Sequence, residues 1–237
     1  MTRYHRQTLL PEIGEEGQYR LQKARVLIVG VGGLGCPIAT YLCGAGVGHL
    51  GLIDDDVVSL SNLHRQVLYT ESDVGQPKVT CAARHLRRLN SDITIDEYPF
   101  RLTKESGADL IRCYDMVIDG CDNFSTRYLI SDLCSTLHIP YIYGAITALS
   151  GQVSILCHGE NAATYRTLFP ERAEGEGYSG KETTSAPSPV IGPTPAIIGS
   201  VQAAEAIKLI CQFGEPLVNK LWNIDLLTMQ TCIISIQ

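Results

Sequence analysis

Short apolar runs, rich in β-branched residues, recur along the chain and alternate with longer segments of helical periodicity. Runs of this kind are typical of the buried strands of a parallel sheet. The first three lie at residues 25–30, 49–54 and 115–119. Apolar positions at helical spacing follow them at residues 32–46, 78–89, 103–112 and 125–137. The alternation predicts βαβ units and therefore an α/β fold with a doubly wound, mostly parallel sheet.

Later segments are predicted to extend this sheet in a different way. Further strands are expected at residues 93–98, 140–145, 152–157, 221–225 and 232–236. The last four are predicted to form an antiparallel C-terminal part. Residues 159–195 contain five prolines and several glycines, which indicates a long mobile connection. A strongly apolar helix is expected at residues 196–211, directly after this connection.

The composition excludes several classes of protein. The chain has 237 residues, a net charge of −6 and no block of basic residues, which argues against a nucleic-acid binder. No apolar run is long enough to span a membrane, and the polar N-terminus lacks an apolar signal core. We therefore expect a cytoplasmic enzyme. None of the nine cysteines is spaced as CxxC, so no zinc knuckle is predicted.

A glycine motif stands at the junction of the first strand and the first long helix. The motif GxGxxG is formed by Gly30, Gly32 and Gly35, and Gly33 occupies one of its variable positions. Such glycines let backbone N–H groups approach a phosphate at the start of a helix, whereas a plain tight turn is the alternative interpretation. Asp54 ends the second strand, where a carboxylate can accept ribose hydroxyls. The context favours a Rossmann-like nucleotide site, without separating a dinucleotide from ATP.

Two cations and an acidic residue refine this prediction. Arg65 and Lys78 follow the second strand, and a triphosphate needs several such charges, although each could be a solvated surface residue. Asp122 follows the strand at residues 115–119, at the same edge of the sheet as Asp54. Its carboxylate could hold Mg²⁺. The alternative is that Asp122 and Asn123 cap the next helix, for which Ser125 is another possible cap.

Several longer motifs, in a fixed order, resemble the ThiF/MoeB/HesA family of the ubiquitin-activating-enzyme superfamily. The resemblance begins at Arg3 and continues through the glycine motif, residues 54–66 (DDDVVSLSNLHRQ), 75–78 (GQPK), 120–123 (GCDN) and 199–208 (GSVQAAEAIK). It implies a homodimer that binds MgATP and adenylylates the Gly-Gly C-terminus of a small ubiquitin-like sulfur-carrier protein.

The resemblance also assigns roles to individual residues. The positions that match the family's nucleotide contacts are Gly30, Gly32, Gly33, Gly35, Asp54, Asp56, Asn62, Arg65, Gln66, Lys78, Asp122 and Asn123. Arg6 matches the arginine that reaches into the partner subunit's site, so the expected catalytic set is Arg6, Arg65, Lys78 and Asp122. One domain is expected over residues 1–237. Its expected parts are a helical arm at 1–24, a nucleotide-binding part at 25–157, a crossover loop at 158–195 and a C-terminal part at 196–237.

Two departures from the family's pattern are visible. The first zinc CxxC pair of many members would fall at Thr164 and Thr167, and the chain ends where the second would lie, so no structural zinc is expected. The loop cysteine of some relatives would fall near Ser185, and no cysteine lies between residues 158 and 210. A covalent sulfur-transfer step from this loop is therefore not expected.

Four functions remain open from the sequence. The first is adenylylation of a sulfur carrier, with a ThiS-like partner of thiamine thiazole biosynthesis preferred over a molybdopterin-pathway partner. The second is the same chemistry on a peptide or natural product. An idle binding subunit is the third, and the charged motif residues argue against it. An NAD-dependent dehydrogenase is the fourth, but His64 lies in the ATP segment and does not favour it.

Overall fold

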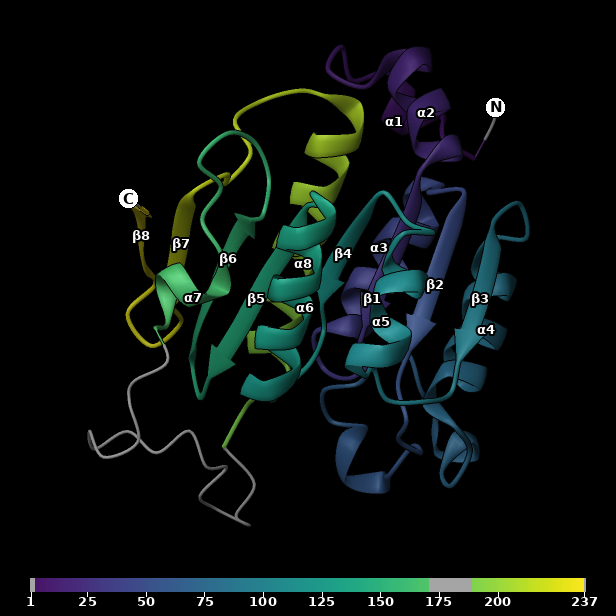
Figure 1. Ribbon diagram of the computed structural model, residues 1–237. Helices are drawn as coiled ribbons and strands as arrows, with labels where there is room; N and C mark the ends of the chain where they lie inside the picture. Colours follow the sequence, from purple (N-terminus) through teal and green to yellow (C-terminus); the bar gives the residue numbers. More distant parts are fainter. Residues whose placement is uncertain (1–2, 171–188, 237) are drawn as a thin grey trace, which may run out of the picture.

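Eight strands form one sheet in the computed structural model, in which residues 3–170 and 189–236 are described (Figure 1). Their order across the sheet is β3-β2-β1-β4-β5-β6-β7-β8. The parallel strands are β1 (Arg25–Val29), β2 (His49–Ile53), β3 (Thr94–Tyr98), β4 (Met116–Asp119) and β5 (Tyr141–Thr147). The antiparallel strands are β6 (Ser150–Leu156), β7 (Lys220–Asp225) and β8 (Gln230–Ser235). The predicted α/β sheet with an antiparallel C-terminal part is confirmed.

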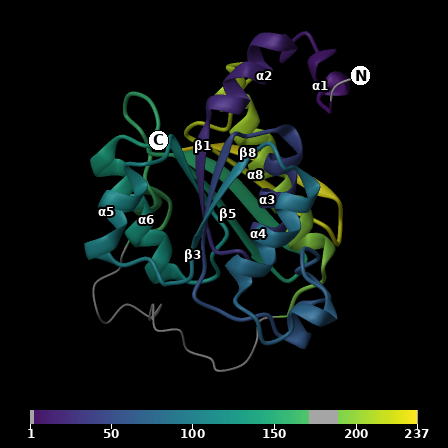
Figure 2. The same ribbon diagram turned by 90° about the vertical axis from the view of Figure 1, so that its right-hand side faces the viewer.

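Helices cover both faces of the parallel part, as Figure 2 shows in a view turned by 90°. The helices on one face are α3 (Gly35–Ala45), α4 (Lys78–Leu89) and α8 (Pro193–Cys211). Those on the other face are α5 (Lys104–Ile111), α6 (Phe124–Leu137) and the short α7 (Tyr165–Leu168). A hydrophobic core lies on each face of the sheet, and alternate residues of β1 point into different cores. Val26 and Ile28 pack with α3, whereas Leu27 and Val29 face α6.

The N-terminal segment lies apart from the carboxyl ends of the strands. Helix α1 (His5–Thr8) and helix α2 (Gly14–Lys23) occupy the upper end of the molecule in Figure 1. Gln18 is buried and donates to the carbonyl of Ala45 at the end of α3, which fixes α2 to the domain. Two short 3-10 helices, η1 (Leu60–Asn62) and η2 (Glu71–Asp73), lie at the opposite end.

Several predicted boundaries differ from the structure. Helix α3 begins at Gly35 rather than at residue 32, because residues 30–34 form the glycine turn. Helix α6 begins at Phe124, and its cap is Asn123 rather than Ser125. Helix α8 begins at Pro193 rather than at residue 196, which fits the preference for proline at the first helical positions.

The strand order reverses between β1 and β4. The chain passes from β1 to β2 and β3 on one side of the sheet and then crosses to β4 on the other side. In open α/β sheets, ligands bind outside the carboxyl ends of the strands at such a switch point. The glycine motif follows β1 and Asp122 follows β4, so the topology brings these two predicted parts of the site together.

A helix that crosses a membrane must be both long and apolar. No helix in residues 3–170 and 189–236 has both properties.

Candidate functional site

Two glycine backbones meet at the carboxyl ends of β1 and β4. Gly30 has a φ of 90°, a conformation that favours glycine. A methyl group on Gly120 would lie 2.1 Å from the carbonyl oxygen of Gly30, and one on Gly35 would lie 2.0 Å from the same oxygen. The chain therefore needs glycine at three places here. Gly120 was not among the predicted site residues, although its place directly after a buried strand was the available signal.

Asp54 ties the turn after β2 to the glycine turn. Its Oδ2 accepts a hydrogen bond from the N–H of Val31 at 2.8 Å, and its Oδ1 accepts one from the N–H of Asp56 at 2.9 Å. Burial raises the pKa of Asp54, while the nearby charge of Lys78 and the two backbone hydrogen bonds act in the opposite direction. The carboxylate therefore lies beside the glycine turn.

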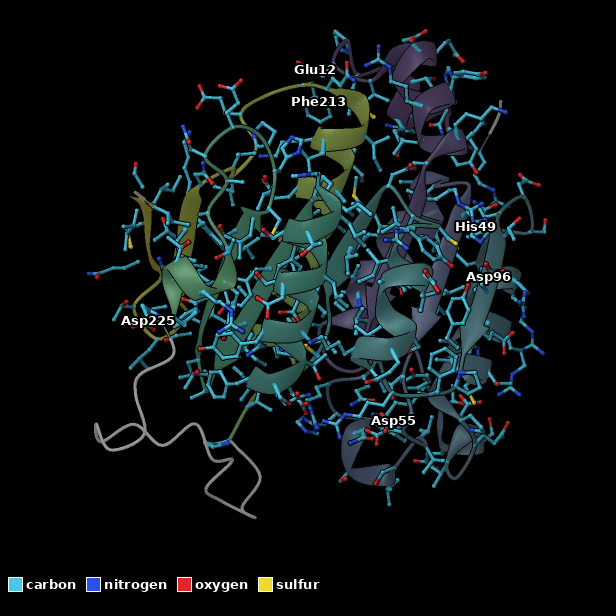
Figure 3. The ribbon with its side chains drawn as sticks, in the orientation of Figure 1. Glu12, His49, Asp55, Asp96, Phe213 and Asp225 are labelled. Carbon is cyan, nitrogen blue, oxygen red and sulfur yellow. The ribbon has the colours of Figure 1, made fainter. Side chains whose placement is uncertain are left out.

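The carboxylates of Asp54, Asp55 and Asp56 offer oxygen atoms within 4.8 Å of one another. Asp55 is labelled at the lower end of the molecule in Figure 3. Lys78 Nζ donates to Asp56 Oδ2 at 2.8 Å, so an ammonium group already balances part of this negative charge. Only 5% of Lys78 is exposed, and a buried ammonium needs such a partner.

Gln66 carries an unpaired acceptor next to the glycine turn. Only 4% of Gln66 is exposed, and its Oε1 has no hydrogen-bond partner among the described residues. A methyl group on Gly32 would lie 3.5 Å from Gln66 Nε2, which places this amide against the turn. Buried polar atoms are normally satisfied, so Oε1 is suited to a donor of a bound ligand. The glycine turn and this acceptor fit a nucleotide.

Arg65 lies on the other side of the glycine turn. A methyl group on Gly33 would lie 3.7 Å from Arg65 Cδ and 3.2 Å from Pro195 Cβ. The Arg65 guanidinium donates to the carbonyl of Ser61 at 3.1 Å, within the segment that also holds Asn62. Asn62 Oδ1 accepts from the N–H of Ser59 at 3.3 Å and so shapes this segment.

The first turn of α8 closes this side of the site. Pro195 borders Gly33, and a methyl group on Gly192 would lie 2.5 Å from the carbonyl oxygen of His64. Neither residue was predicted to be near the nucleotide, because the sequence assigned residues 158–195 to a mobile loop. A proline at the start of an apolar helix was the signal that could have found this contact.

Asp122 and Asn123 follow β4 and have different surroundings. Asp122 is exposed at the carboxyl end of the strand. Asn123 Oδ1 accepts from the N–H of Thr126 at 2.9 Å and caps α6, which agrees with the alternative interpretation of this residue. Carboxylate oxygens are ligands that Mg²⁺ prefers, and Asp122 is free of the helix cap.

Arg6 is not brought to the other predicted site residues. It lies on α1 and is exposed. Glu12, between α1 and α2, marks this upper end in Figure 3, whereas Asp55 marks the opposite end. Within one chain, the structure therefore separates Arg6 from Arg65, Lys78 and Asp122.

The remaining sequence predictions concern zinc and cysteine. Thr164 and Thr167 form a capping box on α7, in which each side chain accepts from the backbone N–H of the other. Cys121 is buried, and burial first and Asp119 second raise the pKa of its thiol well above the usual range. An inert wall residue fits this setting. Ser185 lies outside the described residues.

A groove of about 380 Å³ lies on the antiparallel part of the sheet. Its lining includes Ala145, Thr147, Gln152, Asn223, Asp225 and Cys232. Ala148, in the turn after β5, pairs with Val190, and its carbonyl accepts from Thr194 Oγ1 at 3.1 Å. Thr194 and Pro195 belong to the same turn of α8, so the turn after β5 contacts the part of α8 that borders Gly33.

Comparison with known proteins identifies similar chains. A sulfur carrier protein adenylyltransferase of Thermus thermophilus is 45% identical over 231 residues, covering 96% of this chain and 84% of that protein. The SAMP-activating enzyme E1 of Haloferax volcanii is 41% identical over 229 residues, covering 97% of this chain and 83% of that protein. The MOCS3 adenylyltransferase and sulfurtransferase of Culex quinquefasciatus is 44% identical over 210 residues, covering 89% of this chain. Our chain spans only 47% of that longer relative.

Solved structures share the fold over nearly the whole chain. E. coli MccB with ATP is 25% identical and has a TM-score of 0.87, covering 99% of this chain and 72% of that chain. E. coli MccB with AMPCPP and MccA is 25% identical and has a TM-score of 0.88, covering 99% of this chain and 71% of that chain. The ThiF family itself matches residues 4–237. From its fold, its glycine turn and this match along almost all of its length, the chain belongs to the ThiF family.

Proposed function

We propose that this chain is an ATP-dependent adenylyltransferase that activates the C-terminal glycine carboxylate of a small ubiquitin-like sulfur-carrier protein. The observation that carries the proposal is the glycine turn flanked by Arg65, the buried Lys78 and the unpaired Gln66 acceptor. A dehydrogenase would not need two cations at this place. The relatives named as sulfur carrier protein adenylyltransferase and MOCS3 support the same activity.

ATP is expected to bind with its phosphates along the glycine turn. Gly32 and Gly33 are partly exposed and have no side chains of their own, so a phosphate can approach their backbone, and the start of α3 adds a favourable dipole. Asp54 would accept ribose hydroxyls. Arg65 and Lys78 would stabilise the negative charge of the phosphates. Mg²⁺, held by Asp122, would neutralise further phosphate charge when it is bound with ATP.

The reaction follows from these positions. A carboxylate oxygen of the carrier attacks the α-phosphorus of ATP and forms a new P–O bond. The bond from the α-phosphorus to its bridging oxygen breaks, and pyrophosphate leaves with the electron pair. The products are a carrier acyl-adenylate and pyrophosphate, so no external oxidant or base is required. Such a transfer depends on positioning and on charge stabilisation more than on covalent help from the protein.

A homodimer would complete the site. Arg6 lies at the opposite end of its own chain from the nucleotide residues. Its proposed role therefore requires a second copy that places α1 beside the first copy's phosphates. An arginine supplied in this way would stabilise charge that develops on the leaving pyrophosphate.

The groove on the antiparallel strands is the proposed path of the carrier's tail. Its lining includes the end of β5, and the turn after β5 contacts the first turn of α8, which borders Gly33. A Gly-Gly terminus is extended and lacks side chains, so it can approach the glycine turn closely. We propose a ThiS-like carrier of thiamine thiazole biosynthesis, with a molybdopterin-pathway carrier as the alternative.

A second candidate substrate is a peptide. The structural similarity to E. coli MccB includes a complex with MccA, and the carboxylate chemistry would be the same. Such a substrate would occupy the same groove.

Carrier-dependent exchange of labelled pyrophosphate into ATP tests the proposal. The protein is mixed with MgATP and with each diglycine-tailed carrier encoded near its gene, and each carrier lacking its last glycine is the matched control. Exchange with one intact carrier, and none with its truncated form, is expected. Exchange that is equal with and without the last glycine would contradict the proposal, and exchange with a short peptide alone would favour the second candidate.

A further inference from the structure

A buried ion pair lies beneath the loop that carries Asp122. Arg127 Nε donates to Asp119 Oδ2 at 3.0 Å, and the exposed fractions are 7% for Arg127 and 0% for Asp119. Burying two charges is costly, and apolar residues of similar volume often stabilise a core as well or better. Stability alone is therefore a weak explanation for the presence of this ion pair. The hydrogen bonds that the pair makes to the loop are a better explanation.

Both peptide groups around Cys121 are held by this pair. The N–H of Cys121 donates to Asp119 Oδ1 at 2.9 Å, and its carbonyl oxygen accepts from Arg127 Nη2 at 2.8 Å. That carbonyl belongs to the peptide that leads directly into Asp122. The same Nη2 also donates to the carbonyl of Gly144 on β5 at 3.3 Å. The guanidinium therefore fixes the exit of β4 relative to β5.

Two further elements also contact Asp119. Tyr141 on β5 donates its hydroxyl to Asp119 Oδ2 at 2.9 Å. Gln202 on α8 donates Nε2 to the backbone carbonyl of Asp119 at 2.8 Å. Gly120, the residue between Asp119 and Cys121, packs against the carbonyl of Gly30. The backbone from Asp119 to Cys121 thus has partners on every side, and its position is set relative to the glycine turn.

We propose that Asp119 and Arg127 are positioning residues that set the backbone of Asp122 for the Mg²⁺–ATP complex. This inference rests on the metal role of Asp122 in the proposed function. Neither residue needs to contact the substrate, because both are buried and act through the peptide groups of Cys121. Residues that orient a ligand of a metal typically change metal affinity or activity by about 10- to 100-fold when replaced.

The variant Arg127→Lys retains the positive charge of the pair and tests the hydrogen bonds that the guanidinium makes. A lysine ammonium can still face Asp119, but it lacks the planar group that reaches Asp119, Cys121 and Gly144 together. Tyr141→Phe is the matched control, since it removes a buried hydrogen bond to the same carboxylate and leaves every loop contact in place. The melting temperature of each variant reports whether it is folded.

Two measurements that do not require enzyme activity show whether the pair positions the loop that carries Asp122. The first is hydrogen exchange of the backbone amides at residues 120–123 in the ligand-free protein. The second is calorimetric titration with ATP, with and without Mg²⁺. For Arg127→Lys we expect exchange to accelerate about tenfold and the gain in ATP affinity from Mg²⁺ to fall about tenfold, with metal-free ATP affinity unchanged. For Tyr141→Phe we expect neither change.

Folded Arg127→Lys with wild-type exchange and a wild-type Mg²⁺ effect would overturn the inference. Equal effects in Tyr141→Phe would also overturn it, because the network would then only stabilise the fold. If Arg127→Lys does not fold, Asp119→Asn is measured by the same two readouts and judged by the same outcomes. A wild-type protein that binds ATP without any Mg²⁺ effect would instead refute the metal role of Asp122. Wild-type protein that binds no ATP would refute the proposed function.

Discussion

Backbone atoms rather than side chains form the closest contacts of the site. Gly30, Gly35 and Gly120 meet where a single methyl group would displace the chain. Around them, the buried Gln66 amide lies against the turn, and the buried Lys78 ammonium pairs with Asp56. Single substitutions can therefore test the steric fit of the glycine turn and the charge beside it separately.

Gly35→Ala is predicted to abolish ATP binding. Its methyl group would lie 2.0 Å from the carbonyl oxygen of Gly30, so the glycine turn must shift. Gly44→Ala is the matched control, because Gly44 lies in the same helix and a methyl group there meets nothing within 4 Å. The control should be stabilised by roughly 0.5–1 kcal/mol, since alanine favours a helix. Calorimetric titration with ATP checks the first variant and thermal unfolding the second.

Lys78→Met is predicted to lower pyrophosphate exchange roughly 100-fold, the usual effect of removing one donor that stabilises developing charge. The fold should remain, because the Asp56 carboxylate that loses its partner is largely exposed and can be solvated. Lys104→Met, at an exposed position on α5, is the control and should keep the wild-type rate. An unchanged exchange rate in folded Lys78→Met would refute the role of this ammonium.

At the scale of elements, the strands and most helices could be predicted because their apolar periodicity reflects burial on a sheet. The starts of α3, α6 and α8 could not. Residues 32–34 look helical in sequence but belong to the glycine turn, and both Asn123 and Ser125 are good caps by type. The contact of Pro195 with Gly33 joins segments far apart in the chain, and local pattern does not report such contacts. Arg127 was missed because its partner Asp119 is visible only in the fold.

The buried carboxylate of Asp73 holds the conformation of residues 59–78. Asp73 accepts hydrogen bonds from Thr70 N–H at 2.8 Å and His85 Nε2 at 2.9 Å, and it pairs with Arg84. Burial acts to raise the pKa of Asp73, but the bonds from Thr70 and His85 outweigh it and hold that pKa well below its usual range. Asp73 therefore connects η2 to α4, between Arg65 and Lys78.

Asp73→Asn should lower the melting temperature by several degrees at pH 7. Because the folded pKa lies below the unfolded value of about 3.9, the stabilisation is complete above that value and is lost as the pH falls through the folded pKa. The difference from wild type should thus shrink below about pH 4. Asp92→Asn, at an exposed position, is the control for melting curves between pH 2 and 7. A difference that does not change with pH would contradict this origin of the stabilisation.

Helix α7 is predicted to be independent of zinc. Its Thr164 and Thr167 hydroxyls act as helix caps, and the backbone N–H of Tyr165 donates to Ser131 Oγ at 2.9 Å. A chelator should leave the melting temperature of the ligand-free protein unchanged and should stop pyrophosphate exchange. Added Mg²⁺ in excess of the chelator should restore exchange. A chelator-induced loss of melting temperature that Zn²⁺ reverses would show a structural zinc site.

In the whole molecule, Arg6 lies far from the proposed nucleotide site of its own chain. Whether Arg6 acts in the partner subunit's site can be tested with mixed dimers. Arg6→Ala and Asp122→Ala should each be inactive alone. If Arg6 acts across the interface, subunit exchange between them restores one complete site in each mixed dimer. Random mixing should then recover about a quarter of the wild-type exchange rate. No recovery after demonstrated subunit exchange would place Arg6 in its own chain's site or outside catalysis.

Attack of the carrier's carboxylate on the α-phosphorus of ATP is the step on which the proposed function depends. It is tested most directly with a carrier whose C-terminal carboxylate is labelled with oxygen-18, in the presence of MgATP and hydroxylamine to trap the acyl group. The released AMP is expected to contain one labelled oxygen, because the attacking oxygen stays on phosphorus when the acyl–oxygen bond is cleaved. AMP without label, or label in the pyrophosphate, would contradict attack at the α-phosphorus.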